Sequence, residues 1–340
     1  MKKFFFSIIL FLIVIVSTIV LSEITIRIFA PQAIVPRFVE SAPWGIRKVI
    51  ANVDAIHKTD EYHYRYRTNY QGFRATKEYS LNPEDGVYRI VVQGDSVTLG
   101  HGVKDNETFS AVLEDMLRKK GINAEVINIG VSGFGTAEEL IQFENVAKKY
   151  NPNLIILAYF QNDDKNNHVS KLYEVKDAKL ERKLETFQPG IYLRDRISAI
   201  PFYNFLSQNS HLLTFFRNYF SSYILRQLKE QIPENVKSKK SNEEASLLTQ
   251  LLLNKYIENV TKSGTNLILL DIVDKRFQTD FPKKQLVLNE HTKIVETSSK
   301  FISAKENGIK LYYDVDSHPI AAGHKLIAKI LTENILDIEK

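Results

Sequence analysis

Apolar and polar residues along this chain follow two periods in turn, one typical of strands and one typical of helices. Short runs rich in β-branched residues predict buried strands at 88–93, 124–130 and 153–160. Between these runs, residues 108–121 and 136–152 place apolar side chains at helical spacing. Strand–helix–strand units with short connections require a parallel sheet that carries helices on both faces. The pattern therefore predicts a three-layer α/β/α fold with a parallel sheet.

Cap signals indicate where the predicted helices begin and end. Thr108 is an N-cap candidate for the first helix, and Gly121 is its C-terminal stop. The second helix is expected to begin at Thr136 in a Thr-x-x-Glu capping box that ends at Glu139. Pro319 lies in the first turn of the last predicted helix, where proline is tolerated.

The alternation stops after the third strand and returns near the C-terminal end. Residues from about 165 to 244 are polar, aromatic and irregular, with a helical stretch at 219–232, and we interpret them as an insertion or lid. The α/β pattern then resumes, with predicted elements at 246–264 (helix), 266–273 (strand), 309–314 (strand) and 319–336 (helix).

The N-terminus has a different composition from the rest of the chain. Two lysines precede an uncharged, mostly apolar run from Phe4 to Leu21, which is long enough to approach a bilayer crossing as a helix. The lysines favour a cytoplasmic N-terminus and a body outside the cytoplasm. A cleaved signal peptide is the rival interpretation, but the sequence after the run is a poor cleavage site. A buried core helix is opposed by the flanking lysines and the terminal position.

The division of the chain into domains follows from these patterns. Residues 1–26 are expected to form an uncleaved single-pass membrane anchor. Residues 27–87 form an aromatic and charged lead-in with little periodicity, which we expect to pack on the main domain. Residues 88–340 are expected to form that domain, in the periplasm or at the cell surface, with the insertion at about 165–244 inside it.

Charge and cysteine content exclude several functional classes. The formal net charge is +5, yet basic residues are interspersed with acids, as in KSKKSNEE at 237–244. Such mixing is typical of a solvated surface, so no nucleic-acid partner is predicted. The chain has no cysteine, which rules out disulfides, thiolate metal ligands and a cysteine nucleophile. Its eight histidines form no HExxH-like pattern, and we predict neither a metal nor another cofactor.

Four groups of polar and glycine residues follow predicted strands. In an open parallel sheet, ligands bind beyond the carboxyl ends of the strands. The residues at these ends are, in chain order, Ser96, Gly133 in a glycine-rich turn, Asn162, and Asp316 with His318. A serine nucleophile needs a base, an orienting carboxylate and donors for a developing oxyanion. This edge of the sheet is predicted to hold each of these groups once.

The same residues lie in four short sequence blocks, which read GDSVTLGHGV, NIGVSGFGT, NDD and DSHPIAAGH. In this order they resemble the blocks of the SGNH/GDSL hydrolase family. Gly-Asp-Ser alone is a weak signal, but four blocks in order, each after a predicted strand, are specific. The resemblance spans the chain from about residue 88 to the C-terminus, interrupted by the insertion. It implies a flavodoxin-like sheet and a serine esterase activity.

The resemblance also implies a role for each matching residue. Ser96 resembles the nucleophile, and its backbone N–H resembles an oxyanion donor. Gly133 resembles the glycine whose N–H is a second donor, and Asn162 resembles the asparagine whose side-chain amide is the third. His318 resembles the general base. Without the other blocks, Ser96 would be interpreted as a helix cap and Asn162 as a loop residue that bonds its own backbone.

Two positions depart from the family pattern. The familiar spacing places the triad aspartate three residues before the histidine, where this chain has Val315. We prefer Asp316, two residues before the histidine, as the acid and keep Asp314 in reserve. Phe160 replaces the glycine that usually begins the third block, and it either narrows the site or points into the core.

Other polar residues in these blocks receive no catalytic role. Asp95 is interpreted as a turn residue, and the adjacent Asp163 and Asp164 as decoration of a solvated loop. His324 lies on the last predicted helix and is interpreted as structural.

The predicted function is that of a membrane-anchored serine esterase. It would cleave an O-acyl ester, with O-acetyl as the leading candidate, on a cell-envelope glycan or lipid through an acyl-enzyme. A polysaccharide O-acyltransferase using the same serine is one alternative, and its acyl donor would require another protein of the envelope polysaccharide machinery. A non-catalytic glycan-binding or assembly protein with a relic site is the other. The expected partners are the acylated substrate and the membrane, and the insertion is expected to set substrate choice.

Overall fold

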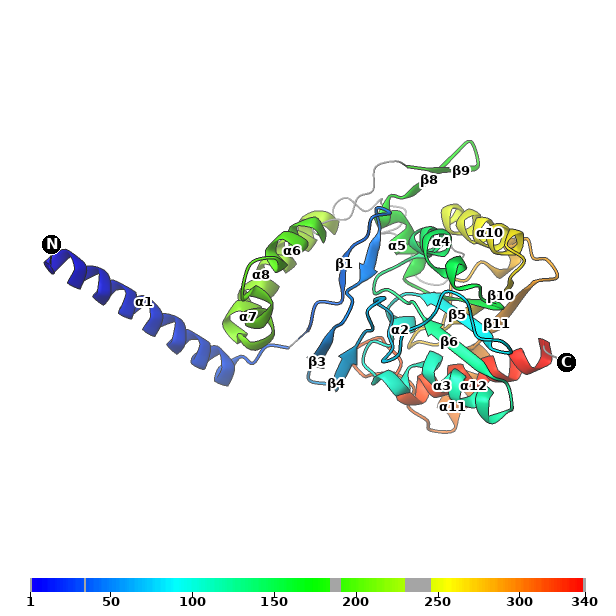
Figure 1. The fold of residues 1–340 in the computed structure, drawn as a ribbon, viewed down its shortest axis with the longest axis horizontal. Coiled ribbons are helices and arrows are strands. Elements are labelled where there is room, and N and C mark those ends of the chain that lie inside the picture. Colours follow the sequence, from blue (N-terminus) through cyan, green and yellow to red (C-terminus); the bar gives the residue numbers. More distant parts are fainter. Residues whose placement is uncertain (1, 34, 184–190, 230–245, 339–340) are drawn as a thin grey trace.

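The computed structural model of the protein describes residues 2–33, 35–183, 191–229 and 246–338. A sheet with helices on its two faces forms the body, and helix α1 (Lys2–Phe29) extends away from it (Figure 1). The charged stretch at 237–244 and parts of the predicted insertion lie outside the described residues.

The central sheet has five parallel strands in the order β11-β10-β7-β5-β6. Their bounds are Tyr88–Gly94 (β5), Ala124–Asn128 (β6), Leu154–Phe160 (β7), Asn266–Ile272 (β10) and Thr292–Glu296 (β11). This is the flavodoxin-like order, and the predicted α/β fold is confirmed. The chain passes from β5 to one edge and then returns to the other side of β5. The carboxyl ends of β5 and β7 therefore flank the switch point where such sheets bind ligands.

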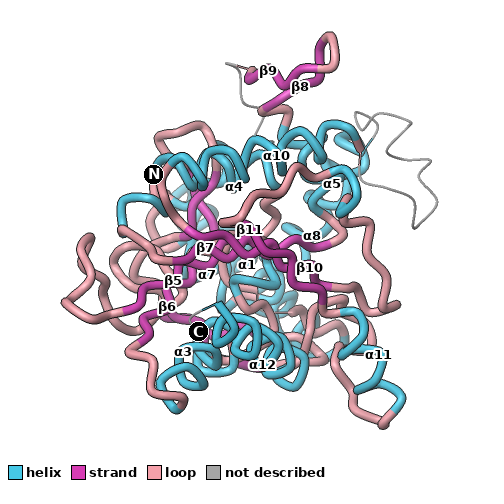
Figure 2. Tube along the Cα trace, turned by 90° about the vertical axis from the view of Figure 1, so that its right-hand side faces the viewer, coloured by secondary structure: helices cyan, strands magenta, loops and turns pink. Residues whose placement is uncertain are grey.

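Helices cover both faces of the sheet (Figure 2). Val91 points to one face, whereas Ile90 and Val92 point to the other, because side chains alternate along a strand. Burial on both faces explains why the strands read as continuous apolar runs. The first face packs against α4 (Thr136–Asn145) and α10 (Leu247–Lys262), and the second against α3 (Phe109–Lys119), α11 (Ser298–Glu306) and α12 (Ala321–Ile338).

The predicted strand at 309–314 is wrong. In the described chain this segment joins no sheet ladder and forms a single bridge, between Tyr312 and Pro319. The edge position beside β10 is taken by β11, which the sequence analysis did not predict. Leu311 and Tyr312 are buried against the second face of the sheet. Burial without strand pairing therefore produced the strand-like pattern.

The predicted capping box of α4 is also wrong by one residue. The helix begins at Thr136, but Gly135 is its N-cap, and the carboxylate of Glu138 accepts the N–H of Gly135 at 3.0 Å. Both glutamates are buried, but Glu138 also pairs with Arg47 of the lead-in at 2.8 Å, whereas the carboxylate of Glu139 accepts no hydrogen bond from a described residue. The ion pair to a distant segment therefore fixes which glutamate serves the cap.

The lead-in folds into two antiparallel hairpins. The first joins β1 (Val39–Ser41) to β2 (Arg47–Val49), and the second joins β3 (Asp54–Lys58) to β4 (His63–Arg67). Tyr64, Tyr66, Phe73 and Tyr79 are buried in the same core as α4 and α10. The aromatic density of this segment thus reflects its packing on the sheet.

The chain between β7 and α10 contributes elements to two places. Helix α5 packs against α4 and α10, whereas α8 contacts α1 and lies apart from the sheet (Figure 1). The elements are α5 (Asp163–Ser170), a hairpin of β8 (Tyr173–Lys176) and β9 (Lys179–Arg182), α6 (Ile191–Ser198), α7 (Tyr203–Asn209) and α8 (His211–Lys229).

Helix α1 is, among the described residues, the one helix long and apolar enough to cross a bilayer. The candidate span runs from Lys3 to Phe29, and its most apolar 18-residue window has a mean hydropathy of 3.1 and is not buried in the structure. A signal sequence near an N-terminus has a similar composition.

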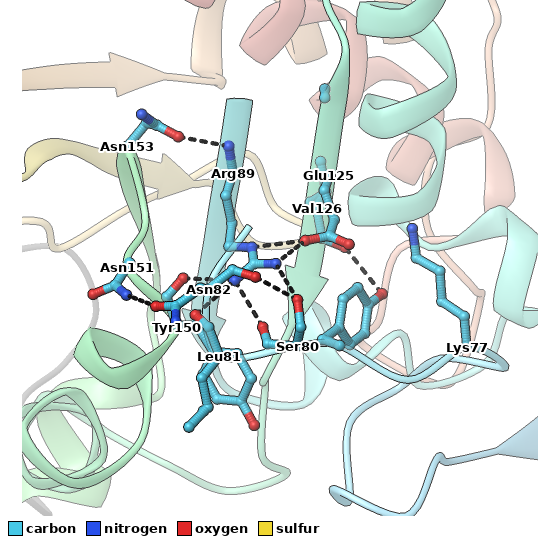
Figure 3. A network of polar contacts seen from close by, with 12 residues as sticks. Lys77, Ser80, Leu81, Asn82, Arg89, Glu125, Val126, Tyr150, Asn151 and Asn153 are labelled. Atoms are coloured by element: carbon cyan, nitrogen blue, oxygen red, sulfur yellow. Dashed lines mark hydrogen bonds and ion pairs between the residues drawn. The ribbon is translucent and has the colours of Figure 1, made fainter. Parts of the chain in front are cut away.

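Arg89 of β5 is buried and connects the lead-in to the sheet through hydrogen bonds (Figure 3). Its side chain is 1% exposed and pairs with Glu125 of β6 at 2.6 Å. The same guanidinium donates to the backbone oxygens of Ser80, Leu81 and Tyr150 at 2.8–2.9 Å. A buried cation with this many partners is stable only while all of them are present.

We expect Arg89→Met to lower the free energy of unfolding by about 3–5 kcal/mol, because it leaves buried carbonyls and Glu125 without their donor. Urea denaturation followed by circular dichroism measures the change. Lys119→Ala is the control, since it removes only an exposed ion pair with Asp115, worth at most about 1 kcal/mol. Equal unfolding midpoints for the two variants would contradict the assignment.

Candidate active site

A tight turn presents Ser96 at the carboxyl end of β5. The strand ends at Gly94, whose φ of +154° favours glycine. A Cβ on Gly94 would lie 3.0 Å from the carbonyl oxygen of Ala158 in β7. Asp95 then caps the short helix α2 (Ser96–Leu99) with its carboxylate. Glycine therefore lets β5 and β7 stay adjacent while the chain turns, which brings Ser96 to the switch point.

Ser96, His318 and Asp316 form one chain of hydrogen bonds. The distance from Ser96 Oγ to Nε2 of His318 is 2.7 Å, across 222 positions of sequence. Nδ1 of His318 contacts Oδ1 of Asp316 closely, and the backbone N–H of His318 donates to the same oxygen at 2.9 Å. Two bonds to one carboxylate oxygen fix the ring so that Nε2 faces the serine.

Of the two aspartates that the sequence left open, Asp316 is the one that contacts His318. The side chain of Asp314 is 80% exposed and pairs with Lys310 at the surface at 2.7 Å. Val315, at the family's usual acid position, is 82% exposed. Partial burial raises the pKa of Asp316, but the hydrogen bonds and charge of His318 outweigh it and hold this pKa well below its usual value. Asp316 is therefore ionised beside the imidazole.

The turn of the β3–β4 hairpin holds Asp316 from the other side. The hydroxyl of Tyr62 donates to Oδ2 of Asp316 at 3.0 Å. The carboxylate of Glu61 accepts the backbone N–H groups of Val315 and Asp316 at 2.9 and 2.6 Å. Both carboxylate oxygens of Asp316 and the backbone of its loop are thus fixed by hydrogen bonds.

His101 packs beneath the catalytic candidate His318. Their ring centroids are 4.4 Å apart, and Nε2 of His101 lies 2.8 Å from the hydroxyl of Tyr62. Since Tyr62 donates its single proton to the carboxylate, Nε2 of His101 must carry the proton in this contact. Burial, with the nearby positive charge of His318, lowers the pKa of His101 to about 3. His101 is therefore a neutral packing and hydrogen-bonding group.

A metal ion has one candidate set of ligands in the described chain. One ligand atom from each of His101, Asp316 and His318 lies within 4.8 Å of the others. These side chains already hydrogen-bond one another, Tyr62 or Ser96. A bound cation would have to break the hydrogen bonds that join Ser96, His318 and Asp316. The observed geometry therefore favours a hydrogen-bonded triad over a metal site.

The glycine-rich turn after β6 lies against the turn that carries Ser96. The N–H of Val131 donates to the carbonyl oxygen of Gly94 at 2.9 Å. Gly133 has a φ of +78°, and its carbonyl oxygen accepts a short hydrogen bond from Arg47, which also pairs with Glu138. The lead-in thereby pins the carbonyl of Gly133 and sets the orientation of the adjoining peptide.

Two backbone N–H groups, one in the turn after β5 and one in the turn after β6, are free in the described structure. No described residue accepts a hydrogen bond from the N–H of Ser96 or from that of Gly133. Such groups are suited to bind a developing negative charge.

Asn162 lies at the end of β7 against the serine turn. Burial raises the pKa of Asp95, and hydrogen bonds from the Val97 N–H and the Asn162 side chain oppose this shift.

Asp163 and Asp164 are 0% and 5% exposed, so their interpretation as solvated loop residues is wrong. Asp163 accepts the N–H at the end of β7, and Asp164 ties α5 to α10.

Phe160 and His324 are structural in the described fold. Phe160 is 8% exposed and belongs to the core on the α3–α12 side of the sheet, so it does not narrow the site. His324 is buried, and its Nδ1 accepts the N–H of Phe109 at 3.2 Å.

Sequence reasoning missed the residues that support the site from the lead-in. Tyr62 is 254 positions from Asp316, and Arg47 is 86 positions from Gly133. The aromatic run around Tyr62 was the one available signal, and it indicated packing and not a contact with a particular carboxylate.

The chain and its fold are similar to those of known acyl hydrolases. Residues 90–331 match the family model described as GDSL-like lipase/acylhydrolase. A two-domain esterase active on acetylated mannans aligns at 13% identity and a TM-score of 0.41, over 74% of this chain and 50% of that one. A mutant of the acetyl-xylooligosaccharide esterase Axe2 from Geobacillus Stearmophilus aligns at 13% identity and 0.43, over 73% and 94%. A member of the lipolytic protein G-D-S-L family from Veillonella parvula DSM 2008 aligns at 14% and 0.41, over 72% and 96%.

The chain spans half the length of the two-domain esterase. No protein with a curated description matches it in sequence. The family model, however, extends from β5 into α12 and contains Ser96, Asp316 and His318. The chain therefore belongs to the GDSL-like lipase/acylhydrolase family and is a hydrolase of ester bonds.

Proposed function

We propose that the protein removes O-acyl groups, with O-acetyl as the leading candidate, from a cell-envelope glycan or lipid through an acyl-enzyme on Ser96. The observation that carries the proposal is the unbroken hydrogen-bond chain from Ser96 Oγ through His318 to Asp316. A serine hydroxyl is a poor nucleophile until a base removes its proton, and Nε2 of His318 lies within reach of that proton.

Acylation and deacylation use the same groups in sequence. Ser96 Oγ attacks the ester carbonyl carbon while its proton moves to Nε2 of His318. Asp316 stabilises the resulting imidazolium. The bond to the alcohol oxygen then breaks, and the alcohol leaves with the proton from Nε2. Water attacks the acyl-serine by the same route, and the carboxylic acid departs as Oγ regains a proton.

The oxyanion formed in both steps would be bound by three donors. The free N–H groups of Ser96 and Gly133 supply two, and the side-chain amide of Asn162 is the proposed third. Loss of one such donor typically lowers turnover about 10²–10³-fold.

Two departures from the family pattern, the shifted position of the acid and Phe160, favoured the alternative of an inactive relic site. The shifted acid still reaches the imidazole, because Asp316 contacts His318 directly. Phe160 belongs to the core and does not fill the site. Both observations support a working esterase over a non-catalytic glycan-binding protein.

The apolar helix α1, with lysines before it, supports a location in the cell envelope outside the cytoplasm.

Ser96→Ala should lower the rate of p-nitrophenyl acetate hydrolysis by the full-length chain by about 10⁴-fold or more, since the nucleophile is lost. Ser303→Ala changes an exposed serine on α11 and should leave the rate unchanged. Equal loss or equal retention in the two variants would rule out the proposed nucleophile.

The two aspartates allow a matched test of the acid. Asp316→Asn should lower kcat by about 10⁴-fold, because the imidazole loses the carboxylate that orients it and stabilises its charge. Asp314→Asn should leave kcat within about twofold, since that side chain is exposed and pairs with Lys310. A steady-state comparison that ranked the variants in the reverse order would assign the acid to Asp314.

Tyr62→Phe should lower kcat by about 10-fold with little change in KM, because Asp316 loses a hydrogen bond to its charged form. Tyr64→Phe is the matched control: it is a tyrosine of the same hairpin whose hydroxyl contacts His57 and not Asp316. The Tyr62 role fails if both variants keep the parent kcat, or if both lose it together with thermal stability.

A further inference from the structure

One face of α8 carries five aromatic side chains that are exposed in the structure. They lie at helical spacing on a single side of the helix, whereas Thr214 on the other side is 4% exposed. Their exposed fractions run from 41% to 68%, and the residues are Phe215, Phe216, Tyr219, Phe220 and Tyr223. We call this set the aromatic face of α8. Helix α7 adds Phe205 and Leu206, which are 65% and 47% exposed.

The start of α8 is fastened to the end of α1. The carboxylate of Glu23 accepts the backbone N–H groups of His211 and Leu212, both at 2.9 Å. Arg27 donates to the carbonyl oxygen of Asn209 at 2.8 Å. The N–H of Gln32 donates to the ring of His211 at 2.8 Å. These contacts fix the first turn of α8 to one level along α1.

The residues of α1 that bind the first turn of α8 lie just after the end of the apolar run of α1. The run from Phe4 to Leu21 is about 27 Å long as a helix at ~1.5 Å per residue, close to the ~30 Å of a hydrocarbon core. Glu23 follows it by two residues. Figure 1 shows α6, α7 and α8 beside the body-proximal end of α1, with α8 running across the direction of α1 and not along it.

From this arrangement we propose that α6, α7 and α8 lie on the outer surface of the bilayer, with the aromatic face of α8 in the lipid interface. The inference rests on α1 spanning the membrane and is independent of the chemistry at Ser96. Tyrosine and phenylalanine on one face of a helix are typical of interfacial helices. Arg194, Arg196 and Arg217 on α6 and α8 supply cations suited to anionic lipid headgroups.

The bilayer fits this face better than a second protein does. The first turn of α8 is bonded to Glu23 and Arg27, just after the apolar run of α1, so a bilayer that ends at this point of α1 would lie next to α8. The membrane contact would also hold the sheet and its site at a fixed height above the membrane, since α8 is anchored at both α1 and the surface.

The full-length chain has no cysteine, so single probes can be placed without background. Phe220→Cys and Phe216→Cys place an NBD fluorophore on the aromatic face, and Val14→Cys places it in α1. Val287→Cys, at a 74% exposed apolar residue beside α10, is the control. Each protein is reconstituted in phosphatidylcholine–phosphatidylglycerol vesicles, with and without lipids that carry a doxyl quencher, and also titrated with iodide.

We expect doxyl lipids to reduce the fluorescence of the Phe216, Phe220 and Val14 probes by about twofold or more, and iodide to quench the Val287 probe instead. If the two α8 probes behave like the Val287 probe while Val14 is protected, the interfacial placement is overturned and the anchor stands. If Val14 is also open to iodide, both are overturned. Hydrolysis of p-nitrophenyl acetate by each labelled protein reports folding and the proposed function separately from these outcomes.

Discussion

The site depends on one hydrogen bond, between a hydroxyl at residue 96 and an imidazole at residue 318. A parallel sheet makes this contact possible because its strands end at one edge, whatever their separation along the chain. Gly94 lets β5 and β7 approach at the switch point while the chain turns toward Ser96. The loop before α12 then carries the proposed base and the proposed acid together, two residues apart.

The lead-in contributes hydrogen bonds to the candidate active site. Glu61 and Tyr62 hold the loop and carboxylate of Asp316, and Arg47 holds the carbonyl of Gly133. These bonds depend on the rigidity of the hairpins, and tyrosines buried against the sheet fix the hairpins. Arg89 fixes the end of the lead-in through the backbone oxygens of Ser80 and Leu81. The packing of the lead-in therefore also keeps the site residues in their preorganised positions.

Two further buried carboxyl groups, those of Glu139 and Asp163, lie close enough to Asp95 of the serine turn to interact with it electrostatically. Burial, together with the negative charges of their neighbours, raises the pKa of Glu139 and Asp163 well above usual values. A raised pKa favours the protonated form, so these groups add little negative charge near Ser96. Hydrogen bonds and the charge of His318 lower the pKa of Asp316 instead, so its carboxylate is ionised beside the proposed base.

The sequence by itself determined four of the five strands of the sheet, its main helices and the four blocks, because two-sided burial and turn chemistry are local patterns. It did not reveal the edge strand β11. It placed Ser96 and His318 in those blocks, and the roles of both remain a prediction to be tested. Only the tertiary structure decided between Asp316 and Asp314. Both are aspartates of the same loop, and they differ in the partner that each side chain contacts. It also turned Phe160 into the core and revealed Tyr62 at the acid. Contacts across more than two hundred positions leave no local pattern, because they are set by how buried surfaces fit together.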